Sequence, residues 1–552
     1  MSRLDEEVKQ DEMLGNMIVL GVSLIVIAGV VIGVIAGVDN PKEATSLSNK
    51  NITLAALCNE TDYKESCISS LESVGNQTEV VIYFKGAVNA TIYEMEDVVK
   101  IAKQVDVARK QEKMALADCI ELVELCLDEL QFVVTMVSAT PSLFFNDSSD
   151  ARTSLSAVLS YQRACIEGIQ EASSTFDMER ALQKSTELTS NSLAIVYAFS
   201  VNDDKGAESS GMSRKLISNH SFDIKIAQAP DAVVAKDGSG KYKSINDAIN
   251  AYPDGHNGRY LIYVKSGTYR ENVIIPKNKT QIFMYGDGMN NTIITGVSMN
   301  GTTYQNAALS AIGNGFICKD IGIIVDTSRR SLLAAVKVQS DNAAFFNCRI
   351  NATNLSIYAL AHRQFFRDCE IYGDTNIIRG DSAVVFQSCK IVVTKPFGSK
   401  VTIIAAQARS DRRESTGFVL HNCNIGGDKS LFPKGLNNAT YLGMPMQKYS
   451  RIIVMESILG DLITSEGWFN NNETYGIETV TFVEYGNKGI GAQTNKRVKW
   501  PGYNVIYNKN DVLRYTFVFP NPPIPLVSFH SSLSLYFHSR GLSSKLSSFA
   551  SG

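Results

Sequence analysis

The stretch AFFNCRINATNLSIYALAHRQFFRDCEIYGDTNIIRGDSAVVFQSCKI, residues 344–391, contains one short phrase three times. Each copy has an apolar residue and Phe, then one or two polar residues, a Cys, a variable residue and Ile. The cysteines are Cys348, Cys369 and Cys389, separated by 21 and 20 residues, and a looser copy surrounds Cys423. β-branched and aromatic residues followed by Asn, Gly or Asp indicate a short strand and then a turn.

The spacing of these copies leaves no room for a helix between successive strands. A strand that recurs at this short period predicts a right-handed parallel β-helix, an all-β solenoid in which equivalent side chains stack from one coil to the next. The alternative is an ordinary antiparallel β domain with four similar strands.

The composition is that of a globular protein with more than one domain. The chain has 552 residues, which is too long for one average core. Its apolar fraction of 44% and charged fraction of 20% exclude wholesale disorder. The net charge of −3 gives no reason to expect nucleic acid as a partner. Because no Cys/His group has the spacing of a zinc site, we expect no metal and no cofactor.

An uncharged apolar run, residues 17–38, is long enough to cross a bilayer as a helix. A cleaved signal peptide has a shorter apolar core of roughly 7–15 residues, so we expect an uncleaved signal anchor. The leader, residues 1–16, carries Arg3 and Lys9 beside five acidic residues. Since basic residues count for more than acids in setting orientation, we place this leader in the cytosol and the bulk of the chain in the secretory lumen.

Asn-X-Ser/Thr triplets agree with a lumenal location, because they accept glycans only there. They begin at Asn51, Asn59, Asn76, Asn89, Asn146, Asn219, Asn278, Asn290, Asn300, Asn351, Asn354, Asn438 and Asn472. A single triplet is common by chance, so the argument depends on their density.

Residues 44–200 have the pattern of an all-α four-helix bundle. Segments such as 95–137 and 154–173 place apolar residues three and four apart, and Gly and Pro are scarce. Antiparallel helices with short connections pack as such a bundle.

Five cysteines lie in this helical region. In an oxidising compartment, Cys58 and Cys67 are near enough to clip a hairpin and Cys119 is able to join Cys165, but spacing does not fix the connectivity. We expect Cys126 to be a small buried hydrophobe rather than a reactive thiol.

Residues 201–228 form a predicted linker. It contains the basic pair Arg214-Lys215, which in an exposed linker is a target for proteases, and a solvated charge pair is the alternative. From residue 229 to residue 517 the composition favours strands. The run DGSGKYKS at 237–244 lacks the first Gly of a phosphate-binding loop, so we interpret it as a turn before a helix at 245–251. We expect the Ser-rich tail, 518–552, to be poorly ordered.

Several motifs resemble the plant pectinesterases that carry an N-terminal pectinesterase inhibitor domain. Those similar to the inhibitor domain are LCN at 57–59 with Tyr63 and Cys67, ALADC at 115–119 and LTSNSLAIV at 188–196. Those similar to the esterase domain are VVAKDGSGKYKSINDAINAYP at 233–253, GTYRE at 267–271 and EYGNKGIGAQTNKRVKWPGY at 484–503. The resemblance implies disulfides Cys58–Cys67 and Cys119–Cys165, processing at Arg214-Lys215, and a location in the cell wall with pectin as the substrate.

The resemblance also implies where catalytic residues belong. Pectinesterases use two aspartates, two glutamines and an arginine, and counting from the repeated cysteine phrases and the matching motifs of this chain places each of them. The nucleophile position falls on Asn376, the general-acid position on Leu355, the two oxyanion positions on Leu332 and Asn354, and the arginine position on Met444. Positions expected to contact the sugar are Tyr269, Tyr358 and Met446, and Met446 replaces a tryptophan.

All five polar catalytic positions are therefore changed. Ester hydrolysis needs a nucleophile, a proton donor for the leaving alcohol and donors to the oxyanion. Leu355 has no proton to give, and the neutral amide of Asn376 is a poor nucleophile. Removing one essential group costs on the order of a millionfold in turnover, so we expect a pseudoenzyme that still binds pectin.

Two other functions are compatible with the sequence. One is an inhibitor or regulatory protein whose helical bundle binds an active pectinesterase. The other is an esterase with displaced catalytic groups, for which His362 and the acids Asp368, Glu370, Asp374 and Asp381 are the candidates. The basic run Arg409, Arg412 and Arg413 is either a contact for an acidic polysaccharide or a solvated loop.

Overall fold

The computed structural model describes residues 52–142, 144–146, 148–174, 176–200, 229–297, 301–325, 334–394, 401–427, 439–470, 476–508 and 511–512. The apolar run 17–38, the pair Arg214-Lys215 and the tail 518–552 lie outside these residues, and what the sequence predicts for them stays a prediction. Among the helices within the described ranges, none is both long and apolar enough to span a membrane.

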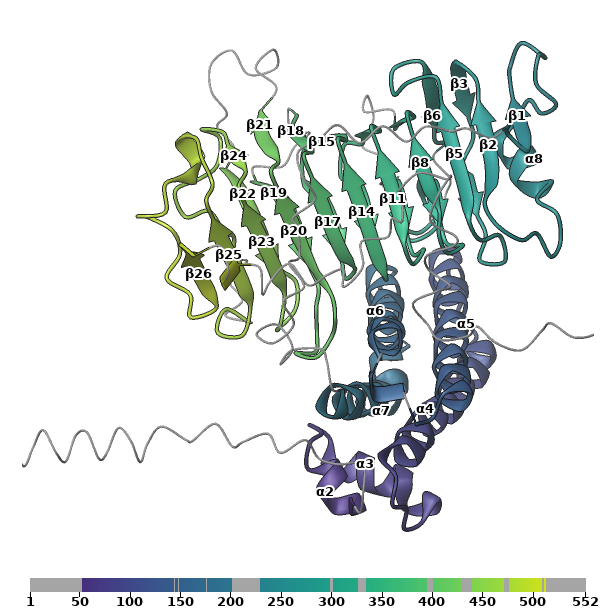
Figure 1. Ribbon diagram of the computed structural model, residues 1–552, viewed down its shortest axis with the longest axis vertical. Helices are drawn as coiled ribbons and strands as arrows, with labels where there is room; N and C mark the ends of the chain where they lie inside the picture. Colours follow the sequence, from purple (N-terminus) through teal and green to yellow (C-terminus); the bar gives the residue numbers. More distant parts are fainter. Residues whose placement is uncertain are drawn as a thin grey trace, which may run out of the picture. The chain divides into compact units, whose positions relative to one another are not determined.

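The N-terminal region is helical, as predicted (Figure 1). Its long helices are α4 (Val80–Gln104), α5 (Lys110–Ala139), α6 (Ser149–Glu171) and α7 (Met178–Phe199), and the short helices α2 (Leu54–Cys58) and α3 (Lys64–Leu71) precede them. Apolar residues spaced by four form the buried face of α4, as Val80, Phe84 and Val88 illustrate. Short 3₁₀ turns span Glu72–Val74, Phe144–Asn146 and Ile490–Ala492.

Two disulfides hold this helical region together. Cys58 is bonded to Cys67, with Cα atoms 5.7 Å apart, and Cys119 of α5 is bonded to Cys165 of α6, with Cα atoms 4.4 Å apart. Both pairs are those that the resemblance implied. Cys126 is fully buried and has no disulfide, and burial raises the pKa of its thiol, so it behaves as the inert residue that we expected.

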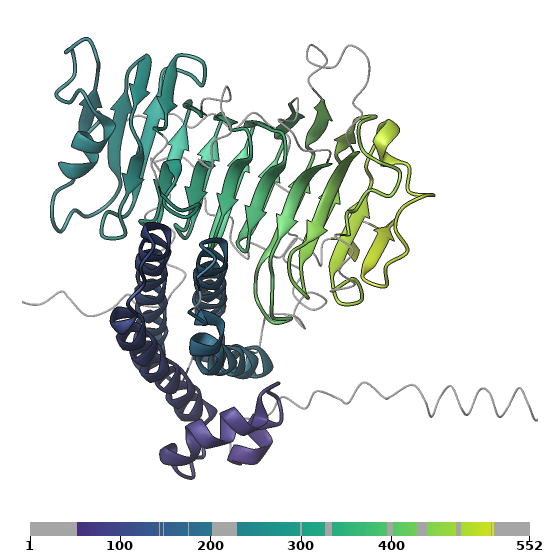
Figure 2. The same cartoon turned by 180° about the vertical axis from the view of Figure 1, so that it is seen from behind.

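The C-terminal region is a right-handed parallel β-helix built from three sheets (Figures 1 and 2). Sheet A contains β1 (Ala232–Val234), β2 (Tyr260–Val264), β5 (Ile282–Gly286), β8 (Ile317–Lys319), β11 (Ala343–Phe346), β14 (Arg363–Arg367), β17 (Ala383–Gln387), β20 (Gly417–His421), β23 (Arg451–Met455), β25 (Thr481–Tyr485) and β26 (Tyr503–Ile506). Sheet B contains β3 (Gly267–Arg270), β6 (Thr292–Thr295), β9 (Gly322–Ile324), β12 (Arg349–Asn351), β15 (Glu370–Gly373), β18 (Lys390–Val393), β21 (Asn424–Gly427) and β24 (Ile458–Leu459). Sheet C contains β4 (Val273–Ile275), β7 (Ala307–Ala311), β10 (Ala334–Val338), β13 (Leu355–Ala359), β16 (Asn376–Gly380), β19 (Val401–Gln407) and β22 (Ala439–Pro445).

The repeated cysteine phrase forms the corner between sheets A and B. Its apolar residues are strands β11, β14 and β17, and the polar residue before each cysteine takes a positive φ of 48–53° at Asn347, Asp368 and Ser388. This left-handed residue turns the chain, which then enters sheet B. The phenylalanines stack inside the coil, with ring centroids 4.6 Å apart for Phe345 and Phe366. Strand pairs in these sheets are parallel, so the antiparallel alternative is wrong.

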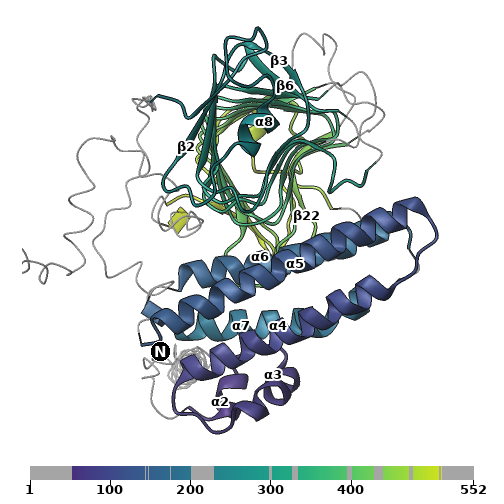
Figure 3. The same cartoon turned by 90° about the vertical axis from the view of Figure 1, so that its right-hand side faces the viewer.

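A short helix, α8 (Ile245–Asn250), lies across the N-terminal end of the coil (Figure 3). Its residues Ile245, Ala248 and Ile249 belong to the same buried core as the strands. Glu271, from the GTYRE motif, accepts hydrogen bonds from the backbone N–H groups of Ile245 and Asn246 at 2.9 and 3.1 Å. The carboxylate therefore caps the helix, and this motif has a structural role.

Ion pairs join the helical bundle to the β-helix. Those between described residues place the basic group on the β-helix and the carboxylate on the bundle: Lys277–Asp128, His362–Glu129, Arg363–Asp150, Arg379–Glu167, Arg379–Glu171, Arg412–Asp62 and Arg413–Asp62. Such a one-sided arrangement gives the two surfaces complementary charge, which fixes the register in which they meet.

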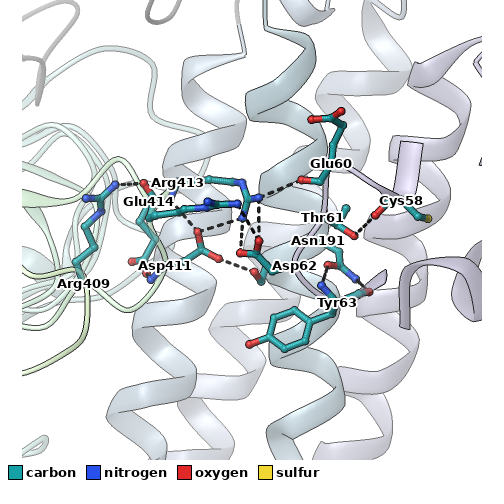
Figure 4. Close-up of polar contacts among 12 residues, drawn as sticks. Cys58, Glu60, Thr61, Asp62, Tyr63, Asn191, Arg409, Asp411, Arg413 and Glu414 are labelled. Carbon is teal, nitrogen blue, oxygen red and sulfur yellow. Dashed lines mark hydrogen bonds and ion pairs between the residues drawn. The ribbon is translucent and has the colours of Figure 1, made fainter. Parts of the chain in front are cut away.

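The basic run of the sequence belongs to this interface (Figure 4). Arg413, whose side chain is 7% exposed, donates to both carboxylate oxygens of Asp62 at 2.7 and 3.2 Å and to the Glu60 carbonyl at 3.0 Å. Arg412 donates to Asp62 at 2.9 Å. Arg409 is buried and donates to the Arg412 carbonyl. These arginines are therefore not a solvated loop, because they bind the bundle or their own loop.

Replacing Phe366 by Ala should destabilise the β-helix strongly. The ring is fully buried between Phe345 and Phe386, so its loss leaves a cavity in the stack. We expect the free energy of unfolding to fall by about 3–5 kcal/mol, measured by chemical denaturation of the full chain. Phe132→Ala is the control, because Phe132 is 48% exposed and its loss should change stability by about 0.5 kcal/mol or less. A fall below about 1 kcal/mol for Phe366→Ala would contradict the stacking argument.

Replacing Asp62 by Asn should loosen the bundle from the β-helix. The hydrogen bond from Arg413 is the main reason that the pKa of Asp62 lies below its usual 3.8. Because the folded pKa is the lower one, this contribution is present above pH 3.8 and is lost as the pH falls through the lowered value. We expect opening to become easier by about 1–2 kcal/mol at neutral pH, since Asp62 is 41% exposed and partly screened.

Hydrogen exchange of the amides in residues 411–416 measures this opening. Asp97→Asn is the matched control, because Asp97 pairs with Lys100 on the exposed face of α4. Exchange in Asp62→Asn that equals the wild type at pH 7, or a difference that persists unchanged at pH 2, would contradict the assignment.

Candidate functional site

The nucleophile and general-acid positions meet on sheet C. Leu355 begins β13 and Asn376 begins β16, and the two residues are paired across neighbouring coils. The backbone N–H of Asn376 donates to the carbonyl of Asn354 at 3.0 Å. Counting along the sequence from the cysteine phrases thus identified three residues that the fold brings together.

These three residues line a cavity of about 330 Å³. Leu355 is 4% exposed, and Asn354 and Asn376 are half-buried. The rest of the lining comes from Arg379 of β16, from the segment 301–303 and from the bundle, where Glu171 at the end of α6 is the acidic group. Since Asn354, Leu355 and Asn376 are uncharged, the β-helix contributes no carboxylate to the described lining of this cavity.

A second row on sheet C holds other predicted positions. Tyr358 pairs with Arg379, Arg379 with Ala406, and Ala406 with Met444, in β13, β16, β19 and β22. Tyr358 and Met446 line a smaller space beside Arg379. The structure therefore brings Tyr358, Met444 and Met446 to the same face as Asn376. Leu332 lies outside the described residues.

Tyr269 is not brought to the cavity. It is in β3 of sheet B, is fully buried in the core, and its hydroxyl donates to the Lys265 carbonyl at 2.9 Å. The side chain has no exposed surface to offer a substrate. Tyr269 lies in the GTYRE motif, two residues before Glu271, which caps α8. Its role in this motif is therefore structural.

Arg379 is the site residue that sequence reasoning missed. Its Nη2 donates to Glu167 of α6 at 2.7 Å, and its Nη1 is 4.0 Å from Glu171. Burial by itself would lower the pKa of Arg379, but Glu167, Tyr358 and Glu171 outweigh burial and raise it. The signal in the sequence was a basic residue three positions after Asn376, within the segment that carries the predicted nucleophile position.

The candidate replacement groups do not gather in the cavity. His362 has its Nε2 3.2 Å from Glu129 of α5, and burial, which would lower its pKa, is outweighed by Glu129, which raises it. Asp381 is fully buried, and burial together with Glu414 raises its pKa well above the usual value. Asp368 and Glu370 lie at the corner before β15 and in β15, and Asp374 is buried. Within the described ranges, no group of three or more His, Cys, Asp or Glu side chains is arranged to hold a metal ion.

Comparison with known proteins identifies both regions. The family described as Pectinesterase matches residues 231–519, and the family described as Plant invertase/pectin methylesterase inhibitor matches residues 53–195. Two relatives from Arabidopsis thaliana are "Probable pectinesterase/pectinesterase inhibitor 13", 35% identical over 84% of this chain and 78% of its own length, and "Pectinesterase/pectinesterase inhibitor 3", 33% identical over 90% and 92%.

A solved structure gives the same assignment for the β-helix. Pectin methylesterase from carrot is 38% identical, with a TM-score of 0.51, over 52% of this chain and 92% of its own. The Pectinesterase match covers the three sheets of the β-helix. The match to the Plant invertase/pectin methylesterase inhibitor family covers most of the helical bundle and its two disulfides. The chain belongs to the pectinesterase family, in the form in which a pectin methylesterase inhibitor domain precedes the pectinesterase domain.

Proposed function

We propose that this chain is a pectinesterase-family protein that binds pectin but does not hydrolyse its methyl esters. The observation that carries the proposal is the pairing of Leu355 with Asn376 across neighbouring coils, in a cavity to which the β-helix gives no carboxylate. The scaffold supplies a place for a sugar, and the charged groups that would attack its ester are replaced.

The chemistry explains why these replacements matter. A leucine cannot protonate the leaving methanol, and an amide at the nucleophile position cannot form the acyl intermediate that a carboxylate would form. Met444, at the arginine position, offers no charge to hold a nucleophile in place. Loss of one such group lowers turnover by up to about a millionfold. Loss of the remaining groups lowers turnover little further, because they act as a unit.

A second candidate function is regulation of another pectinesterase by the bundle. The observation that favours it is the row of carboxylates that the bundle presents to a β-helix, including Asp62, Glu129 and Glu167. In this chain those groups are already paired with the chain's own β-helix. The bundle must therefore leave its own β-helix before it acts on another, and the unchanged activity of an added active pectinesterase would count against this role.

The proposed location is the cell wall, reached through the secretory pathway. The apolar run 17–38, the glycan acceptor triplets and the disulfides Cys58–Cys67 and Cys119–Cys165 support it. Cleavage at Arg214-Lys215 would separate the β-helix covalently from the apolar run 17–38 and from the bundle.

Methanol release from methyl-esterified pectin tests the proposal. We would insert a specific protease site in the linker 201–228, cut the chain, and compare it with a restored chain that carries Leu332→Gln, Asn354→Gln, Leu355→Asp, Asn376→Asp and Met444→Arg. We expect the cut parent to be at least about 10⁴-fold slower than carrot pectin methylesterase, because nucleophile and acid are both missing. We expect the restored chain to gain measurable turnover.

The comparison separates missing chemistry from coverage by the bundle, because both chains carry the same bundle and the same cut. Turnover of the cut, unsubstituted chain within about a hundredfold of the carrot enzyme would refute the proposal. It would favour an esterase with displaced catalytic groups. Binding of the cut parent to immobilised pectin is measured alongside, and failure to bind would remove the pectin-binding part.

A further inference from the structure

Arg379 changes the charge of the cavity. The β-helix contributes one charged side chain, Arg379, to the described lining of the cavity. This side chain is 22% exposed. It stands three residues from Asn376 in the same strand, β16. The β-helix side of the cavity therefore carries a positive charge and no negative one.

The structure already shows a carboxylate bound to this arginine. Glu167 of α6 accepts a hydrogen bond from Nη2 of Arg379 at 2.7 Å. A carboxylate oxygen of Glu171 lies 4.0 Å from Nη1 of the same arginine. Glu171 is itself fixed by the Thr303 hydroxyl at 3.0 Å. The planar guanidinium is suited to carboxylates, which it can bind through two parallel N–H groups.

Among the described residues of the β-helix, no acid forms an ion pair with Arg379. Asp381, two residues further along, accepts hydrogen bonds from Gln407 at 3.0 Å and Thr416 at 2.7 Å. Burial and the neighbouring Glu414 favour its protonated form. The guanidinium is thus neutralised by the bundle, and it loses its partner when the bundle moves away.

We propose that Arg379 makes the cavity a binding site for the free carboxylate of a uronic acid, so that this chain binds unesterified polyuronate in preference to the methyl ester. This inference rests on the proposed pectin-binding function and names the form of pectin that is bound. Glu167 and Glu171 occupy the place of the uronate carboxylate while the bundle is docked. A methyl ester offers Arg379 only a neutral acceptor, which forms a hydrogen bond roughly half as strong as a charged one.

Calorimetry with short uronides tests the proposal on the full chain. The probes are digalacturonate and its dimethyl ester, and the variant Glu167→Gln/Glu171→Gln removes the competing charges while keeping the shape of α6. We expect this variant to bind digalacturonate about tenfold more tightly than the wild type does, and to bind the dimethyl ester without change. Adding Arg379→Gln should abolish the gain, and Arg379→Lys, which keeps the charge but not the fork, should keep part of it.

The control is Glu94→Gln, which removes a bundle carboxylate that pairs with Lys184 and is not among the residues lining the cavity. It should leave both affinities unchanged, and circular dichroism checks that each variant is folded. No gain, an equal gain for the dimethyl ester, or a gain that survives Arg379→Gln would overturn the proposal. Methanol release is recorded in the same samples: turnover of the ester would refute the proposed function alone, whereas uronate binding without preference would refute this inference alone.

Discussion

Backbone hydrogen bonding between parallel strands of successive coils decides which side chains of this protein meet. The register places Phe345 on Phe366 inside the coil and Leu355 on Asn376 on its outer face. A slip of one residue would exchange inner and outer side chains, so the buried rings hold the register of the outer row as well. The site is therefore as fixed as the core, even though Asn354, Leu355 and Asn376 lie outside the hydrophobic cluster inside the coil.

This separation explains why residues on the outer face of a pectinesterase scaffold can change without disturbing its core. The apolar residues Ile357 and Ile378 point into the core, and their neighbours Leu355 and Asn376 line the cavity. In the proposed pseudoenzyme, Leu355 and Asn376 replace two carboxylates, which removes charges whose desolvation is costly. The proposed changes are thus compatible with a stable fold.

The bundle and the β-helix form one composite site. Carboxylates of the bundle meet cations of the β-helix at Asp62, Glu129 and Glu167, and the cavity is closed on one side by the end of α6. Arg379 links the two, because the same guanidinium lines the cavity and holds the bundle. A ligand that binds Arg379 also weakens the docking of the bundle, because ligand and bundle compete for the same guanidinium.

The sequence by itself determined the parallel solenoid and the helical bundle, because each depends on a local pattern or a repeated spacing. The two disulfide pairings and the positions of Asn354, Leu355 and Asn376 came instead from motifs that resemble the pectinesterases. The sequence did not reveal that Tyr269 is a core residue, that Arg409, Arg412 and Arg413 lie at the interface, or that Arg379 faces Glu167. These contacts join residues that are as much as 353 positions apart, as for Arg413 and the Glu60 carbonyl. Only the tertiary structure decides them, because a side chain's partner on another domain depends on how the two surfaces pack, and no periodicity along the chain records that packing.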